Sequence, residues 1–256
     1  MPYTLSHTVF AVPIKRLNRK LFCSTGLALG SMSPDFEYFF HLQSYRTIGH
    51  TVEGLFFQAI PACILLALVY HHLLKEAVAF HLPSYRHLDQ RAVRLLGRWR
   101  LRTVREWATF LFSVIVGFIT HIVLDACTHR TGYVVMRLPF LREVSLFGLP
   151  VYQILQYGLS VSGLLIIALV AWSRLRRAPV EANHDFPSVD DKQKFMFWLV
   201  ACSISLLTTV LKLTWSPRSS TISILAVAPV TGMLLGLFVS SLLFRHLKPR
   251  LARLSR

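Results

Sequence analysis

Acidic residues are scarce in this chain. Asp and Glu together number 12, against 28 Lys and Arg, which gives a formal net charge of +16 over 256 residues. In a soluble protein such an excess of positive charge would indicate nucleic-acid binding. Here the basic residues lie between and after long hydrophobic runs, so anionic lipid headgroups explain them better. The sequence predicts a lipid bilayer as partner and no nucleic acid.

Cysteine is also sparse, and the chain contains no CxxC pair. The cysteines occur singly, and most lie in or beside apolar runs: Cys23, Cys63, Cys127 and Cys202. A disulfide framework or a zinc finger needs cysteines at paired spacings, so neither is expected. Internal repeats are absent too, which argues against the repeated halves on which many transporters are built.

Long apolar runs are the main feature that is present. Hydrophobic residues make up 54% of the chain, and they gather in runs of about 17–25 residues, enough to cross a bilayer. The expected spans are residues 54–74, 107–125, 152–172, 195–213 and 222–244. The predicted fold is all-α, a multi-pass transmembrane helical bundle of about five spans with short N-terminal interfacial or re-entrant helices.

The segments between the spans differ in composition. We predict a motif-bearing membrane domain over residues 1–172, a polar linker over 173–194, two further helices over 195–244 and a basic tail over 245–256. Within the arginine-rich loop of residues 75–106, residues 91–105 have the pattern of an interfacial amphipathic helix. Gly232 and Gly236 form a GxxxG that could pair helices, but the oligomeric state has no clear signal.

The distribution of positive charge predicts the orientation in the membrane. The 75–106 loop, the linker and the tail share one side, and they carry more Lys and Arg than the other side. The side richer in Lys and Arg is normally cytoplasmic. We therefore expect a protein of the inner (plasma) membrane with its C-terminus in the cytoplasm. The N-terminal region and the end of the second span would face the opposite side.

Residues 117–132, GFITHIVLDACTHRTG, contain the main candidate site. His121, Asp125 and His129 recur at intervals of four, which stacks them on one face of a helix. Ionisable side chains at membrane depth are costly and commonly functional. The alternative is a His–Asp hydrogen bond that only neutralises two poorly placed groups.

Other ligand-type residues are expected on the same membrane face. If residues 1–53 hide no span, they lie on the same side as the end of the second span. Imidazole nitrogen and carboxylate oxygen suit zinc, with manganese or iron as alternatives. The predicted ligands of a divalent metal are His7, Asp35, His50, His121 and Asp125. Each also has a structural interpretation, such as Asp35 capping a helix.

Further residues could serve catalysis around such a metal. Glu37 could be the general base or a further ligand. Arg46, Arg130 and Arg137 could hold a phosphate group, because the guanidinium matches phosphate geometry.

The order of these motifs resembles a known group. Ser6-His7, SPDFE at 33–37, RTIGHT at 46–51 and the H-x-x-x-D-x-x-T from His121 to Thr128 are the matching elements. They are similar to the predicted membrane-bound metal-dependent hydrolases of bacteria, a group that includes a LexA-regulated inner-membrane protein. The chain departs from that pattern at Tyr45, where the group has a histidine, and at Glu37, where it has an aspartate.

A second resemblance covers residues 1–163. The N-terminal PYTLSH and the GLPVY of residues 148–152 resemble a bacterial family of uncharacterised multi-pass proteins, which implies no activity. From the residues and the first resemblance together, we predict a membrane-bound metal-dependent hydrolase acting on a phosphoester or lipid-like substrate. The alternatives are a non-enzymatic membrane scaffold with structural His/Asp pairs and a transporter with a proton relay.

Overall fold

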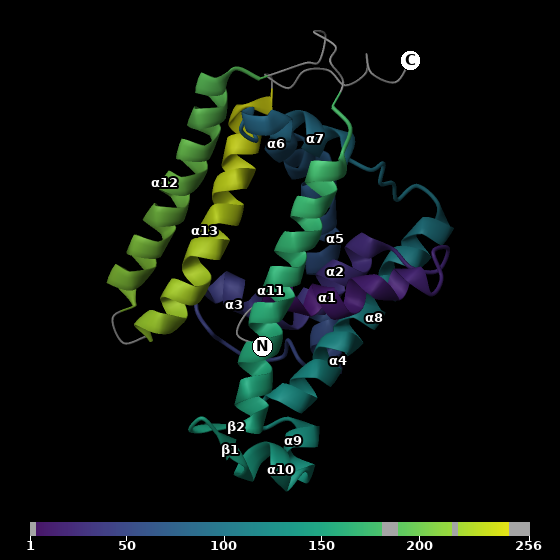
Figure 1. Ribbon diagram of the computed structural model, residues 1–256, viewed down its shortest axis with the longest axis vertical. Helices are drawn as coiled ribbons and strands as arrows, with labels where there is room; N and C mark the ends of the chain where they lie inside the picture. The colour runs from purple at the N-terminus through teal and green to yellow at the C-terminus, as the bar shows by residue number, and fades with distance from the viewer. Residues whose placement is uncertain (1–3, 181–188, 217–219, 246–256) are drawn as a thin grey trace. The chain divides into compact units, whose positions relative to one another are not determined.

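The computed structural model describes residues 4–180, 189–216 and 220–245, and helices account for most of them (Figure 1). Five helical stretches are long and apolar enough to cross a membrane: Val52–Phe80, Val104–Arg137, Val151–Arg177, Asp191–Trp215 and Thr221–Leu243. In the described ranges the only strands are β1 (Ser145–Leu146) and β2 (Leu149–Pro150), which pair antiparallel. The all-α fold with about five spans is therefore confirmed.

Most of these stretches extend beyond the apolar runs that predicted them. The first joins α4 (Val52–Gly54), α5 (Ile60–Val69) and α6 (Lys75–Phe80) through two π-helical turns. The second begins with α8 (Val104–Thr128), three residues before the predicted start at Trp107. The Thr103 hydroxyl accepts from the Glu106 amide, and the Glu106 carboxylate accepts from the Thr103 amide. This capping box satisfies amides that hydropathy alone does not detect.

The N-terminal region consists of short helical pieces, as predicted. They are η1 (Thr4–His7), α1 (Thr8–Ala11), η2 (Val12–Arg16), α2 (Ser24–Met32), η3 (Ser33–Asp35) and α3 (Phe36–His41). None of these pieces reaches the length of a membrane span. The basic tail from residue 246 onward and the middle of the predicted linker, 181–188, lie outside the described residues.

The predicted amphipathic helix over residues 91–105 is wrong. Helix α7 (Leu88–Arg94) ends near the start of the predicted range, and residues 97–102 contain no helix before α8 starts. Gly97 disfavours a helix there. Arg91 has another role, because its guanidinium donates to three carbonyls at the end of α11 (Val151–Arg177), those of Leu175, Arg176 and Ala178. It supplies the hydrogen bonds that the last carbonyls of a helix lack.

The chain divides into two compact units. The first unit contains Met1–Phe36, Arg46–Ala67 and Arg100–Ala171, and the second contains Glu37–Tyr45, Leu68–Trp99 and Trp172–Arg256. In the first unit α2 packs against α8. A Cβ at Gly30 would collide with the backbone of Val114, and one at Gly117 would meet the carbonyl of Leu27. These two glycines allow the backbones of α2 and α8 to approach closely.

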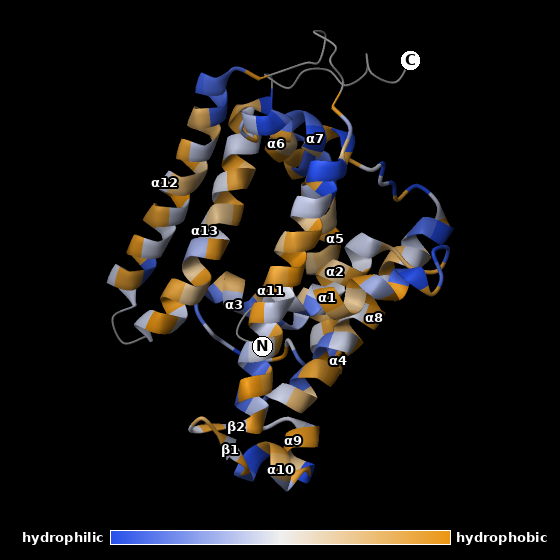
Figure 2. Ribbon diagram, viewed as in Figure 1, coloured by the Kyte–Doolittle hydropathy of each residue, from blue (hydrophilic) through white to orange (hydrophobic). Residues whose placement is uncertain are grey.

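In the second unit the dominant packing is between α12 (Asp191–Trp215) and α13 (Thr221–Leu243). Apolar residues run along both helices, and polar residues gather at the start of α12 (Figure 2). Side chains added at Gly232 or Gly236 would collide with the backbone of Ser205 or Ala201. The GxxxG sequence therefore brings together two helices of the same chain.

Candidate metal centre

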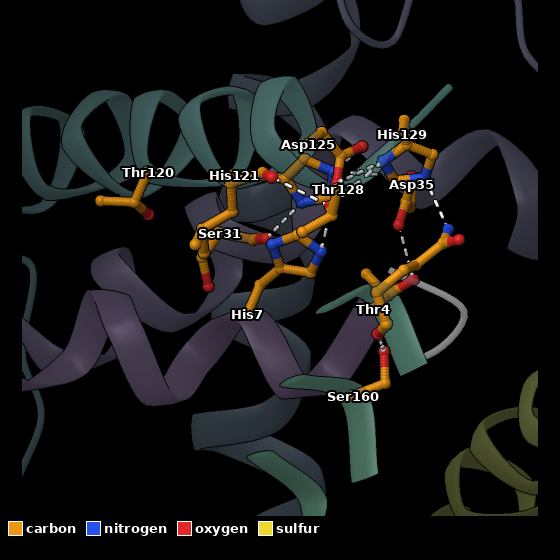
Figure 3. A network of polar contacts seen from close by, with 12 residues as sticks. Thr4, His7, Ser31, Asp35, Thr120, His121, Asp125, Thr128, His129 and Ser160 are labelled. Carbon is orange, nitrogen blue, oxygen red and sulfur yellow. Dashed lines mark hydrogen bonds and ion pairs between the residues drawn. The ribbon is translucent and has the colours of Figure 1, made fainter. Parts of the chain in front are cut away.

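The five predicted metal ligands lie together in the first unit, at the C-terminal half of α8. Their ligand atoms form two overlapping groups: His7, Asp35 and His121, and His50, His121 and Asp125. Within each group the atoms lie within 4.8 Å of one another. Figure 3 shows His7 and Asp35 beside the His121 and Asp125 side chains of α8. Segments far apart in the sequence meet at one end of the second span, as the topology argument predicted.

Helix α8 contributes a stack of three side chains. His121 is fully buried and Asp125 nearly so, and His121 Nε2 lies 3.4 Å from Asp125 Oδ2. His129 follows one turn later at the C-cap of α8, and its Nδ1 lies 3.3 Å from Asp125 Oδ1. The interval of four residues therefore aligns the three groups as the sequence indicated.

The imidazole of His121 is oriented by the backbone of α2. Its Nδ1 lies 2.8 Å from the carbonyl oxygen of Ser31, in the last turn of α2. The carbonyls of a last turn lack partners within the helix, so this one is free to accept. A donor role for Nδ1 leaves the lone pair of Nε2 facing the cluster, as in many metal-binding histidines.

Asp35 is held in a comparable way. The Thr4 hydroxyl donates to Asp35 Oδ2 at 2.8 Å. Oδ1 then faces two imidazole nitrogens, His50 Nε2 at 3.5 Å and His121 Nε2 at 3.7 Å. One carboxylate oxygen is thus used for positioning and the other is directed into the cluster.

His7 adds a third imidazole that is completely buried. Its ring stacks on that of His121, with centroids 3.8 Å apart. Among the described residues, neither ring nitrogen of His7 has a hydrogen-bond partner. Burial, and after it the charge of His121, lowers the pKa of His7 to about 2. His7 is therefore neutral at physiological pH, in the form that binds metals.

The spacing of the ligand atoms fits a cation better than it fits hydrogen bonds. Four atoms form a closed ring, with successive separations of 3.5, 3.7, 3.4 and 3.4 Å: His50 Nε2, Asp35 Oδ1, His121 Nε2 and Asp125 Oδ2. Hydrogen bonds between such atoms would be shorter, about 2.7–3.2 Å. Neighbouring ligands at about 2.1 Å from a tetrahedral zinc ion lie about 3.4 Å apart, which is close to these four separations. Two carboxylates with neutral imidazoles also match the charge of a divalent cation.

Buried nitrogens without partners support the same interpretation. In the described part of the chain, His121 Nε2 and both nitrogens of His7 lack hydrogen-bond partners. A buried polar atom left unsatisfied costs about 1–3 kcal/mol, and native proteins contain few of them. A cation at the centre of the cluster would satisfy His121 Nε2, one nitrogen of His7 and both carboxylates together.

Arg46 lies against the same cluster. Its Nη2 is 2.9 Å from His50 Nε2 and 3.5 Å from Asp125 Oδ2. The guanidinium therefore contributes positive charge beside Asp125. A cation bound to His50 Nε2 would need the lone pair that Arg46 now contacts, so Arg46 has to move. Its side chain is 42% exposed, which leaves it room to do so.

The remaining predicted residues are placed differently. Glu37 is buried at the start of α3 and belongs to the second unit, so its role as general base stays a prediction. Arg130 is exposed and follows His129 directly. The guanidinium of Arg137 lies over the Tyr133 ring, 4.4 Å from its centroid.

Three contributors were missed by the sequence analysis. Thr4 and Ser31 position Asp35 and His121, and Gln156 of α11 lies with its Nε2 3.2 Å from His129 Nε2. Thr4 stands just before the Ser6-His7 element, which offered a weak signal. A backbone carbonyl and a glutamine inside an apolar span offer none.

Comparisons with known proteins place the chain in a family without assigning an activity. No curated protein and no solved structure matches it, and nothing found links it to the metal-dependent hydrolases that its motifs resemble. A family described as a domain of unknown function, DUF4184, matches residues 1–244. This match includes all five spans and every residue of the cluster. The chain therefore belongs to the DUF4184 family.

Proposed function

We propose that this protein is a membrane-bound, metal-dependent hydrolase that cleaves a phosphoester at the membrane surface. The observation that carries the proposal is the ring formed by His50, Asp35, His121 and Asp125, whose neighbouring ligand atoms are 3.4–3.7 Å apart. Zinc fits the mixed nitrogen and oxygen ligands, and manganese or iron would also accept them. His7, stacked on His121, is the fifth proposed ligand.

The proposed reaction is hydrolysis by a water molecule. A divalent cation in the cluster would lower the pKa of a bound water towards 7 and stabilise negative charge on the phosphoryl group. The water oxygen forms a bond to phosphorus, the ester P–O bond breaks, and the departing oxygen takes up a proton. Arg46 and Arg130 are proposed to hold phosphoryl oxygens, since guanidinium groups pair well with them.

The proposed setting is the inner (plasma) membrane. Five helices of sufficient length and hydropathy support it. The excess of Lys and Arg on the loops that share a side with the C-terminus supports a cytoplasmic location for that end. The metal centre would then face the opposite side.

Metal content is the direct test. We expect the protein purified in detergent to hold a single divalent transition-metal ion per chain by elemental analysis. His50→Ala should lose that ion, and Asp35→Asn should bind it more weakly. His50 is the preferred variant because its side chain is 14% exposed, so its removal leaves a smaller buried defect than removal of His121. The matched control is His41→Ala, an exposed histidine outside the cluster.

Activity is tested on the same samples. Release of phosphate from a phosphorylated lipid in mixed micelles should require the metal and should be lost in Asp125→Asn. A wild-type protein that neither contains nor takes up a divalent cation would leave the scaffold interpretation, in which the buried His and Asp side chains only fix helix packing.

A further inference from the structure

The first unit contains a cavity of about 670 Å³ just beyond the C-terminal end of α8. Its size falls within the range of about 300–1,000 Å³ typical of small-molecule sites. The lining comes from the residues after α8, from α9 (Tyr133–Arg137) and α10 (Pro139–Glu143), and from the start of α11. The lining residues are Arg130, Thr131, Met136, Arg142, Pro150 and Tyr152. We call it the arginine pocket.

The arginine pocket is positively charged. Its lining contains two guanidinium groups and no acidic side chain. Among the described residues, Arg130 has no hydrogen-bond or ion-pair partner, and Arg142 contacts the Met136 sulfur and the exposed Glu143 at 3.8 Å each. Neither arginine is therefore held by a strong internal acceptor. Each guanidinium can bind two phosphate oxygens in a forked geometry, and Thr131 and Tyr152 add hydroxyl groups that can donate.

The pocket is connected to the metal centre along two elements. Along the chain, Arg130 directly follows His129, whose Nδ1 is 3.3 Å from Asp125 Oδ1. Along α11, Tyr152 precedes Gln156 by one turn, on the same helix face. Gln156 in turn contacts His129, with the two Nε2 atoms 3.2 Å apart. The arginine pocket is thus linked to the proposed metal ligand Asp125 through His129, which follows it at the C-cap of α8 and contacts Gln156 of α11.

The surroundings of the pocket are apolar and exposed. Large side chains that project from α9, α10 and the β1–β2 hairpin are Tyr133, Met136, Leu138, Phe140 and Phe147. Figure 2 shows hydrophobic and hydrophilic residues interleaved over α9 and α10. Aromatic and basic residues mixed in this way at the end of a span are typical of the membrane–water interface. A ligand in this place can keep its anionic group in the pocket and its hydrocarbon part against the apolar side chains.

We propose that the arginine pocket binds the phosphate group of a lipid, and that this phospholipid-like molecule is the substrate of the metal centre. Only the claim that this lipid is the substrate rests on the proposed function. Arg130 and Arg142 are the phosphate-binding residues, and Arg142 was not singled out by the sequence.

The test measures binding rather than turnover. Short-chain phosphatidic acid is titrated in detergent into wild type and into Arg130→Gln, Arg142→Gln and the double variant. Each hydrogen-bonded charge contributes about 1.5–3 kcal/mol, so each single variant should bind at least about tenfold more weakly. The matched control is Arg105→Gln, an exposed arginine at the start of α8 that does not line the pocket. It should bind as wild type does.

Two further probes separate the sources of phosphate and the two proposals. Inorganic phosphate and short-chain diacylglycerol should both bind far more weakly than phosphatidic acid, and equal binding of either would refute a lipid-borne phosphate. Metal content should be unchanged in all arginine variants. If the protein contains metal but its affinity for phosphatidic acid is unchanged in the Arg130 and Arg142 variants, the lipid-binding proposal is refuted and the metal centre is not. If the protein contains no metal but binds phosphatidic acid through these arginines, the metal centre is refuted and the lipid-binding proposal is not.

Discussion

Both units of this protein bury charged side chains, but they do so in different ways. In the second unit, Lys194 Nζ lies 2.6 Å from Asp89 Oδ2 and 2.7 Å from the Ser84 hydroxyl, which donates to Asp191 at 2.9 Å. Every contact is at hydrogen-bond length. In the first unit, the imidazole and carboxylate atoms around His121 stay 3.4–3.7 Å apart.

This difference is the one expected between a structural network and the proposed metal-binding site. The Lys194 network is complete within the chain, because positive and negative groups neutralise each other at close range. The cluster around His121 keeps buried nitrogens without hydrogen-bond partners among the described residues. A network that only stabilised the fold would be expected to close these gaps, since unsatisfied buried groups are costly. The following experiments test whether this distinction is real.

We call the Lys194 network closed and the cluster around His121 open. The largest effect on stability is expected from breaking the closed network. Lys194→Met leaves the Asp89 carboxylate buried without its cation, which should cost about 3–5 kcal/mol of stability. Thermal unfolding in detergent measures the loss, and the exposed Lys192→Met serves as control. The double variant Lys194→Met/Asp89→Leu should recover much of the stability. Metal content should stay at the wild-type level, and a loss of metal without unfolding would contradict the separation of the two clusters.

Removing the metal should destabilise wild type through the open cluster. A ligand present at about 100 times its dissociation constant stabilises the folded state by about 2.7 kcal/mol. Chelation should therefore lower the unfolding temperature of wild type and leave that of His50→Ala unchanged. Equal sensitivity of the two proteins to the chelator would mean that the ion is bound elsewhere.

The close approach of α2 and α8 should matter for the open cluster. In Gly117→Ala the new Cβ would meet the Leu27 carbonyl at 2.5 Å and the Ser31 amide at 2.8 Å. Such overpacking typically costs about 1–3 kcal/mol, and it would shift the Ser31 carbonyl that orients His121. We expect reduced stability together with reduced metal occupancy. Gly158→Ala, where nothing lies within 4 Å, should change neither.

The smallest effect is expected from the hydroxyl that positions Asp35. Thr4→Val removes its hydrogen bond to Oδ2 and keeps the shape of the side chain. Loss of such an outer contact typically weakens metal binding about 10–100-fold. Competition with a fluorescent chelator measures this change. Thr120→Val, which loses only a bond to the Gly117 carbonyl of its own helix, should bind metal as wild type does.

The sequence predicted the open cluster better than the closed one. His7, Asp35, His50, His121 and Asp125 could be grouped because hydropathy placed them on one membrane face. Lys194 and Asp89 could not, because they fall in a predicted polar linker and a basic loop. A pairing of residues so far apart in the sequence leaves no periodic pattern.

The helices were likewise predictable from apolar residues, and the contacts between polar residues were not. Apolar runs located all five spans, whereas their polar ends had to be seen in the structure. Arg91 illustrates the limit: it was assigned to a lipid-facing helix because of its neighbours' charge. Its actual partners are backbone carbonyls, that of Arg86 and three after residue 174, and a carbonyl has no residue type by which a sequence could identify it.

Arg46 has a consequence for how the protein matures. Two carboxylates brought together without a positive charge would repel each other and oppose folding. With its guanidinium beside Asp125 and His50, the polypeptide carries its own counter-ion, and its folding in the bilayer would not depend on the proposed metal. Uptake of the proposed metal would then be an exchange of one cation for another, and the displaced arginine would be released to meet an incoming anion.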